Sequence, residues 1–200
     1  MNIGISNIFP TPIYYSLDTF SENIDELEKK ILSLKDNNDT VRTSTLNVDS
    51  SHLTVPNLNK LGHPFNIFAD EIERHLLLFT KRLGISPKLK ISNMWFNISD
   101  RGDFNFPHSH PGSIISGVFY VKSNGNSDLR FYNNHYLVSN FISSDDDKVN
   151  EMSYYIWDIP CARGKLLMWP SHIIHGNPMQ TEEGQKIAVS FNTVIDTESL

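Results

Sequence analysis

From residue 88 to the C terminus, the chain is a succession of short apolar segments interrupted by Gly, Asn, Asp and Pro residues. The segments are rich in β-branched and aromatic residues, a composition that is typical of β-strands. They span residues 89–92, 94–98, 114–121, 129–132, 154–159, 166–169 and 187–195. Many short strands in sequence predict a sandwich or barrel-like β domain.

The part before residue 88 has a different pattern, which predicts two amphipathic helices. Thr19 and Glu22 have the spacing of a capping box ahead of the first helix. Its apolar stripe consists of Ile24, Leu27, Ile31 and Leu34. In the second helix, residues 65–83, apolar residues recur three or four positions apart, and Gly84 follows as a candidate C-cap. Residues 8–15 alternate apolar residues with prolines, which predicts an extended edge segment.

Length and composition favour one globular domain and exclude several classes of protein. We expect a single domain, 1–200, of the α+β class and mainly β, with residues 1–87 as the extended segment and supporting helices and residues 88–200 as the β core. With 17 Lys and Arg against 23 Asp and Glu, the net charge of −6 makes nucleic acid an unlikely partner. The lone Cys161 fits a reducing compartment, and no apolar run reaches the length of a membrane helix, so we expect a cytoplasmic protein.

Two histidines of the β region stand two positions apart, His108 and His110. In an extended chain such residues point to the same face, so both imidazoles can reach one metal ion. A third ligand must come from elsewhere, and His172 and His175 both follow the apolar segment 165–169. Neutral imidazole suits iron, zinc, copper or nickel, so the side chains alone leave the identity of the metal open.

Lys186 opens the last apolar segment, whose residues alternate between two faces. One face carries Lys186, Ala188, Ser190 and Asn192, and the other face is largely apolar. A cation at the mouth of a β cavity is suited to an anionic ligand.

Several motifs occur in an order that resembles the iron(II)/2-oxoglutarate-dependent oxygenases. They are the His-x-His pair, Ser-Gly-Val-Phe-Tyr-Val at 116–121, Gly-x-Leu-x-x-x-Pro-Ser at 164–171, the distal His175, and Lys186 ahead of Ile-Ala-Val-Ser-Phe-Asn. Within that superfamily the chain resembles a branch of small bacterial and phage 2-oxoglutarate oxygenases, which also open with Phe-Pro-Thr-Pro, as at residues 9–12. The resemblance spans most of the chain and implies a double-stranded β-helix, a cupin-like jelly roll with helices packed on its outer sheet.

The resemblance also implies roles for individual residues. His108 would be the first metal ligand, His110 the second and His175 the distal one. Lys186 would pair with the distal carboxylate of 2-oxoglutarate, where many relatives have arginine. The chain departs from the widespread pattern at His110, where most relatives have Asp or Glu. Three neutral imidazoles leave a bound ion with its full 2+ charge, whereas a carboxylate cancels one unit.

Other polar residues are candidates for contacts in the same site. Asn97, Tyr120, Ser190 and Asn192 are candidates for binding the cosubstrate, with ordinary packing and structural hydrogen bonds as the alternative. Arg130 is a weaker candidate for binding the substrate, with a surface salt bridge as the alternative.

We assign the remaining residues of interest to structural roles. The other histidines are expected in loops, on polar helix faces or near the site without binding metal: His52, His63, His75, His135 and His172. Trp95, Trp157 and Trp169 are expected in the core. The acidic residues 143–148 are expected to form a solvated loop.

The resemblance implies an iron(II)/2-oxoglutarate-dependent dioxygenase, in which O2-dependent oxidative decarboxylation of 2-oxoglutarate is coupled to hydroxylation of a substrate. Two alternatives stay open: a three-histidine cupin-type iron dioxygenase that does not use 2-oxoglutarate, and a non-enzymatic metal- or ligand-binding β-helix protein. We expect a small-molecule or peptide substrate, no membrane partner, and a homodimer formed through an outer helix or an edge strand.

Overall fold

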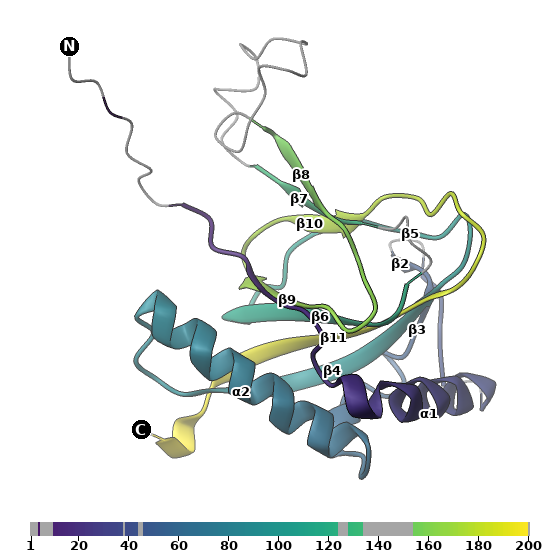
Figure 1. Ribbon diagram of the computed structural model, residues 1–200, viewed down its shortest axis with the longest axis horizontal. Coiled ribbons are helices and arrows are strands. Elements are labelled where there is room, and N and C mark those ends of the chain that lie inside the picture. Colours follow the sequence, from purple (N-terminus) through teal and green to yellow (C-terminus); the bar gives the residue numbers. More distant parts are fainter. Residues whose placement is uncertain are drawn as a thin grey trace.

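Two β-sheets face each other, and two helices cover the outer face of the larger sheet (Figure 1). The computed structural model describes residue 4 and residues 10–37, 39–43, 46–123, 128–133 and 154–199. The arrangement confirms the prediction of a mainly β, α+β fold with helices on the outer sheet. The predicted acidic loop, residues 143–148, lies outside the described residues, as does His135.

The larger sheet has six strands, and all its neighbouring strands are antiparallel. In spatial order they are β1 (Tyr14–Ser16), β9 (Leu166–Pro170), β6 (Ile115–Lys122), β11 (Lys186–Ile195), β4 (Leu89–Ser99) and β3 (Asp49–Ser50). The predicted segments 89–92 and 94–98 form one strand, β4. The predicted extended segment ends in β1 at the sheet edge, and its residues 8 and 9 lie outside the described part of the chain.

The smaller sheet has five strands. In spatial order they are β2 (Leu46–Asn47), β5 (Phe104–His108), β10 (His175–Asn177), β7 (Leu129–Tyr132) and β8 (Ile156–Ile159). Local sequence patterns do not predict β5 and β10, because Asn, His, Pro and Gly predominate in them and their β-propensity is low. Backbone pairing with β2, β7 and each other holds them in the sheet.

The helices are α1 (Ile24–Asp36) and α2 (Phe65–Leu83). Short 3-10 turns are η1 (Ser21–Asn23), η2 (Leu58–Lys60) and η4 (Thr197–Ser199). The predicted capping box is wrong: η1 precedes α1, its N-cap Asn23 makes no side-chain capping bond, and the Thr19 hydroxyl is buried without a partner in the described structure. The predicted C-cap of α2 is confirmed, because Gly84 has φ 69°, which glycine adopts without strain. No helix within the described residues is long and apolar enough to cross a membrane.

The two faces of the larger sheet have different surroundings. Apolar side chains of the outer face pack against both helices, and the rings of Phe119 in β6 and Phe68 in α2 lie 4.8 Å apart between centroids. The inner face is turned toward the smaller sheet and lines a cavity of about 650 Å³. The predicted faces of β11 are confirmed, since Ile187, Val189 and Phe191 lie in the outer core. Lys186, Ala188, Ser190 and Asn192 line the cavity.

Candidate metal centre

Three histidines meet at one end of the cavity. His108 ends β5 and lies opposite His175, the first residue of β10, in the antiparallel register. His110 follows β5, and its backbone N–H donates to the Ser171 carbonyl at 3.0 Å. One ring nitrogen of each histidine lies within 4.8 Å of those of the other two. The structure thus brings together the three predicted ligands.

A glycine permits the close pairing of the two strands that carry His108 and His175. A Cβ on Gly176 would lie 2.8 Å from the backbone oxygen of Asn105. Any other residue here would push β10 away from β5, and His175 would move with it.

Backbone carbonyls determine which nitrogen of two imidazoles faces inward. The Nδ1 of His108 lies 2.7 Å from the Phe106 carbonyl, and the Nδ1 of His175 lies 2.9 Å from the Ile173 carbonyl. A carbonyl only accepts, so each Nδ1 carries the proton and each Nε2 presents a lone pair.

The spacing of these nitrogens fits one ion. The Nε2 atoms of His110 and His175 are 3.2 Å apart. Two nitrogens bound about 2.1 Å from an ion, at roughly 90–100° to each other, are about 3.0–3.2 Å apart. The three residues therefore fit a metal ion such as iron(II).

Electrostatics keep two of the imidazoles neutral at physiological pH. Burial, reinforced by the neighbouring His108, lowers the pKa of His110 to about 4 and that of His175 to about 3. Neutral imidazole is the form that binds metal. His172 is exposed and is not among the residues that line the cavity.

Lys186 lies in the wall of the same cavity and is 5% exposed. Burial lowers the pKa of its ammonium to about 8, and electrostatic interactions with Cys161, Asp128 and Asp103 partly oppose that effect. The structure gives this ammonium no hydrogen bond or ion pair with any described residue. A buried cation without such a partner is costly unless a ligand supplies one.

Three further predicted residues line the cavity near unsatisfied polar atoms. The Tyr120 hydroxyl is buried without a partner among the described residues, and burial raises the pKa of this phenol well above its usual value. The Asn97 amide nitrogen donates to the Ser190 hydroxyl at 3.2 Å, while its oxygen has no partner there. Because a hydroxyl also donates, a flipped Asn97 amide would keep the Ser190 bond and offer an N–H donor to the cavity.

The structure gives Asn192 and Arg130 different surroundings. Asn192 lines the cavity, but its side chain is hydrogen-bonded to His110 and accepts from the Ser116 hydroxyl at 2.7 Å. These contacts orient the imidazole of His110, one of the three predicted metal ligands. Arg130 lies outside the cavity lining and forms two 2.7 Å hydrogen bonds to the Asp158 carboxylate on β8. That ion pair matches the structural alternative for Arg130.

His52 is a cavity residue that the sequence patterns do not indicate. Ser51 fixes it beside β4, since the Ser51 N–H donates to the Phe96 carbonyl at 3.0 Å and its hydroxyl accepts from the Phe96 N–H at 3.1 Å. The His52 ring lies 4.4 Å from that of Trp95, and both line the cavity. No local pattern signals this, because the contact depends on the pairing of β3 with β4. The expectation of a core position is confirmed for Trp169 and is wrong for Trp157, which is 47% exposed.

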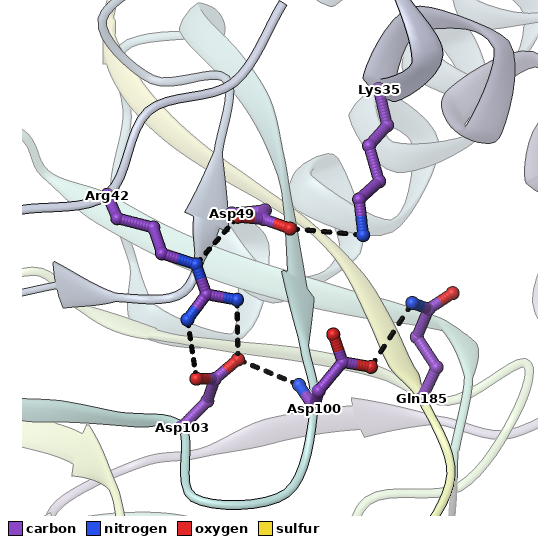
Figure 2. Close-up of polar contacts among 6 residues, drawn as sticks. All are labelled: Lys35, Arg42, Asp49, Asp100, Asp103 and Gln185. Carbon is purple, nitrogen blue, oxygen red and sulfur yellow. Dashed lines mark hydrogen bonds and ion pairs between the residues drawn. The ribbon is translucent and has the colours of Figure 1, made fainter. Parts of the chain in front are cut away.

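A charged network holds the turn that leads into β5. Figure 2 shows Arg42 between two carboxylates: its guanidinium makes 2.7 and 3.1 Å bonds to Asp103 and a 2.7 Å bond to Asp49. Asp103 also accepts from the Asp100 N–H at 2.8 Å, and the Gln185 amide donates to Asp100 at 3.3 Å. Asp103 precedes β5, which ends in His108, and Gln185 precedes Lys186. The network therefore anchors the start of β5, which carries His108, and the start of β11, which carries Lys186.

Comparisons with solved structures identify the fold. A Pseudomonas putida prolyl-4-hydroxylase is 10% identical, with a TM-score of 0.65 over 91% of this chain and 92% of that one. HygX from Streptomyces hygroscopicus, solved with nickel and 2-oxoglutarate, is 14% identical, with a TM-score of 0.67 over 94% and 84%. The viral collagen prolyl hydroxylase vCPH of Paramecium Bursaria Chlorella virus-1 is 9% identical, with a TM-score of 0.57 over 90% and 94%. No curated protein matches by sequence.

The fold is thus the double-stranded β-helix of the 2-oxoglutarate oxygenases, as predicted. Residues 93–192 match the model of a family described as "Putative 2OG-Fe(II) oxygenase". This match covers half of the chain and includes all three histidines and Lys186. The chain belongs to this 2OG-Fe(II) oxygenase family, and the family implies iron(II) and 2-oxoglutarate as its cofactor and cosubstrate.

Proposed function

We propose that the chain is an iron(II)/2-oxoglutarate-dependent dioxygenase that hydroxylates its substrate. His108, His110 and His175 would hold the iron, and Lys186 would bind the distal carboxylate of 2-oxoglutarate. One observation carries the proposal: a single cavity contains three converging imidazoles and a buried ammonium without a hydrogen-bond partner in the described structure. Bound iron(II) would supply the activation of O2 that couples decarboxylation of 2-oxoglutarate to substrate oxidation.

The chain's own residues bind and orient the cosubstrate. Lys186 offers a charge-assisted hydrogen bond to one carboxylate. The Tyr120 hydroxyl and the Asn97 amide are partly unsatisfied groups of the same cavity, so they supply further hydrogen bonds. Apolar residues, among them Leu129 and Trp169, keep bulk water from this part of the cavity.

An anaerobic titration of the iron(II)-loaded protein with 2-oxoglutarate tests the proposal. Chelation of a 2-keto acid to iron(II) produces a visible charge-transfer band, which should appear and saturate. The band should be absent in His175→Ala, which removes a ligand. If wild-type protein retains iron and shows no band, the proposed use of 2-oxoglutarate is wrong.

Two cation variants separate the role of Lys186 from a general charge effect. Lys186→Ala should retain iron and bind 2-oxoglutarate weakly. Arg130→Ala is the matched control, because its guanidinium is paired with Asp158 outside the cavity. The control should titrate like wild type, and equal affinity in both variants would refute the role of Lys186.

The third imidazole favours a second candidate function, a three-histidine iron dioxygenase that does not use 2-oxoglutarate. This function predicts consumption of O2 without formation of succinate, and it gives the buried Lys186 no task. Iron binding without O2 consumption under any condition would instead favour the non-enzymatic alternative.

The size of the cavity supports the proposed substrate class, a small molecule or one side chain of a peptide. Its volume of about 650 Å³ lies within the roughly 300–1,000 Å³ of small-molecule sites. A cytoplasmic location, a homodimer and the absence of nucleic-acid or membrane partners stay predictions.

A further inference from the structure

The charge of the cavity is unusual at the end where the metal ligands meet. None of the described residues that line the cavity is Asp or Glu. Three neutral imidazoles leave a divalent ion at 2+, and chelation by one keto-acid carboxylate reduces this to 1+. Two imidazoles and one protein carboxylate would instead give zero at the same point. The protein itself leaves this excess positive charge uncompensated.

We propose that the cavity selects a substrate that carries an anionic oxygen group, a carboxylate or a phosphate, and that His52 contacts this group beside the metal centre. The proposal rests on the proposed function, because the charge count assumes a bound ion and 2-oxoglutarate. It goes further by naming the chemistry of the substrate and a residue that recognises it.

The charged groups near Lys186, at the other end of the cavity, do not neutralise the excess positive charge at the metal centre. Lys186 is occupied by the distal carboxylate of the cosubstrate. Asp128 and Asp103 act on Lys186 from outside the cavity lining, and Asp103 is already paired with Arg42. One uncompensated positive charge therefore remains on the ion and its three imidazoles. His52 lies at the same end of the cavity.

His52 is built to offer a donor there. The Ser51 hydrogen bonds to Phe96 hold its backbone, and its ring lies 4.4 Å from the Trp95 ring. Trp95 in turn stacks against the proposed ligand His110, with ring centroids 6.1 Å apart and ring planes inclined by 24°. Neither ring nitrogen of His52 has a hydrogen-bond partner among the described residues. The ring contact with Trp95 positions the imidazole, and its ring N–H remains available to a ligand.

The rest of this wall suits an organic molecule attached to the anionic group. Phe106, Pro107 and Pro111 line the cavity and offer apolar contacts. Ser109, which stands between His108 and His110 in the sequence, also lines the cavity. A simple anion should therefore bind weakly, yet measurably, at the charged centre alone.

Anion binding to cobalt(II)-loaded protein that is saturated with 2-oxoglutarate tests the proposal. Acetate and inorganic phosphate are titrated separately while the visible cobalt bands report coordination, and equilibrium dialysis reports retention of 2-oxoglutarate. We expect at least one anion to bind without displacing 2-oxoglutarate. Tighter binding of acetate identifies a carboxylate substrate, and tighter binding of phosphate identifies a phosphorylated one.

Ligand variants test the charge count. His110→Asp and His108→Asp place the same added negative charge at two positions of the centre. Each should retain cobalt and weaken anion binding by about tenfold or more, because one unit of charge is removed close to the anion. Unchanged anion affinity in both variants would overturn the charge argument.

A third variant tests His52. His52→Phe keeps the ring contact with Trp95 and removes the N–H, so it should weaken anion binding about fivefold and leave the cobalt and 2-oxoglutarate affinities unchanged. His63→Phe is the matched control, since His63 is exposed and paired with Glu26. Equal anion affinity in His52→Phe and wild type would overturn the role of His52.

The failure of this proposal is distinguishable from the failure of the proposed function. If cobalt and 2-oxoglutarate bind but neither anion does, or if the anion only displaces 2-oxoglutarate, the anionic substrate class is wrong and the oxygenase proposal stands. If 2-oxoglutarate itself does not bind, the proposed function fails first.

Discussion

The two faces of the larger sheet serve opposite purposes. On β11, the outer residues Ile187, Val189 and Phe191 are fully buried among apolar neighbours from both helices. On the inner side, Lys186 is nearly as buried, at 5% exposure, yet its ammonium has no described hydrogen-bond partner. Alternate residues of β11 therefore lie in two environments. The outer ones pack in a core that stabilises the fold, and the inner Lys186 lies in a cavity wall where its burial lowers stability.

Because of this difference, the groups available to a ligand lie on the inner face of the larger sheet. The outer face satisfies its side chains by packing alone, which needs no ligand. The inner face leaves polar atoms of Asn97, Tyr120 and Trp169 buried without partners in the described structure. Unsatisfied buried groups are rare in native proteins, and a ligand that satisfies them recovers the lost interactions.

The largest expected effect is on the outer face. Phe119→Ala should lower the free energy of unfolding by about 3–5 kcal/mol, because it leaves a cavity against Phe68. Urea unfolding measures this loss, and Phe119→Leu is the milder control. The variant that remains folded should bind metal with wild-type affinity. A loss of metal affinity without a loss of stability would break the proposed division between the faces.

The next effect is on the inner face and has the opposite character. Lys186→Met should weaken 2-oxoglutarate binding by roughly 100-fold while leaving the free energy of unfolding unchanged or higher, because a buried charge is removed. Anaerobic titration and urea unfolding of the same sample give both values. A clear loss of stability would show that Lys186 supports the fold as well as the ligand.

A pH series sharpens the role of the same residue. The free Lys186 has a pKa of about 8, lowered by burial, so the ammonium is present below pH 8 and is lost as the pH rises above it. The dissociation constant of 2-oxoglutarate should therefore increase by up to roughly tenfold per pH unit above 8. In Lys186→Arg the affinity for 2-oxoglutarate should change little up to pH 9, because a guanidinium stays charged. An equal loss of affinity in the wild type and in this variant would assign the titration to another group.

The smallest effect is expected at the network of Figure 2, which joins the edge strand β3 of the larger sheet to the turn before β5. Arg42→Lys keeps the charge but loses the paired bonds to Asp103, so it should weaken metal binding by about twofold to threefold through the shifted start of β5. Arg101→Lys is the control, because Arg101 lies in the same turn and its ion pair with Glu183 is exposed. Equal metal affinity in the Arg42→Lys variant and the control would show that the network does not position His108.

Much of the fold follows from local patterns. Periodicity predicts the apolar stripe of α2, its C-cap at Gly84 and the two faces of β11. The same reasoning fails where a long-range contact replaces a local one. Thr19 has the spacing of a capping residue, but its backbone N–H instead donates to the Gly164 carbonyl at 2.9 Å, near the start of β9. The strands β5 and β10 are not among the predicted strands, because Asn, His, Pro and Gly predominate in them and their β-propensity is low.

Local sequence patterns are enough to predict which side chains of a strand share a face, because alternation along a strand depends only on the pleat. These patterns therefore identified His108 as a candidate metal ligand and Lys186 as a candidate anion-binding residue. The resemblance to a family selected His175 over His172. Long-range packing, in contrast, places His52 in the cavity wall, Asn192 in contact with His110, and Arg130 outside the cavity. These placements arise from backbone pairing between strands distant in sequence, and backbone hydrogen bonds are nearly the same for every residue type, so no side-chain pattern records them.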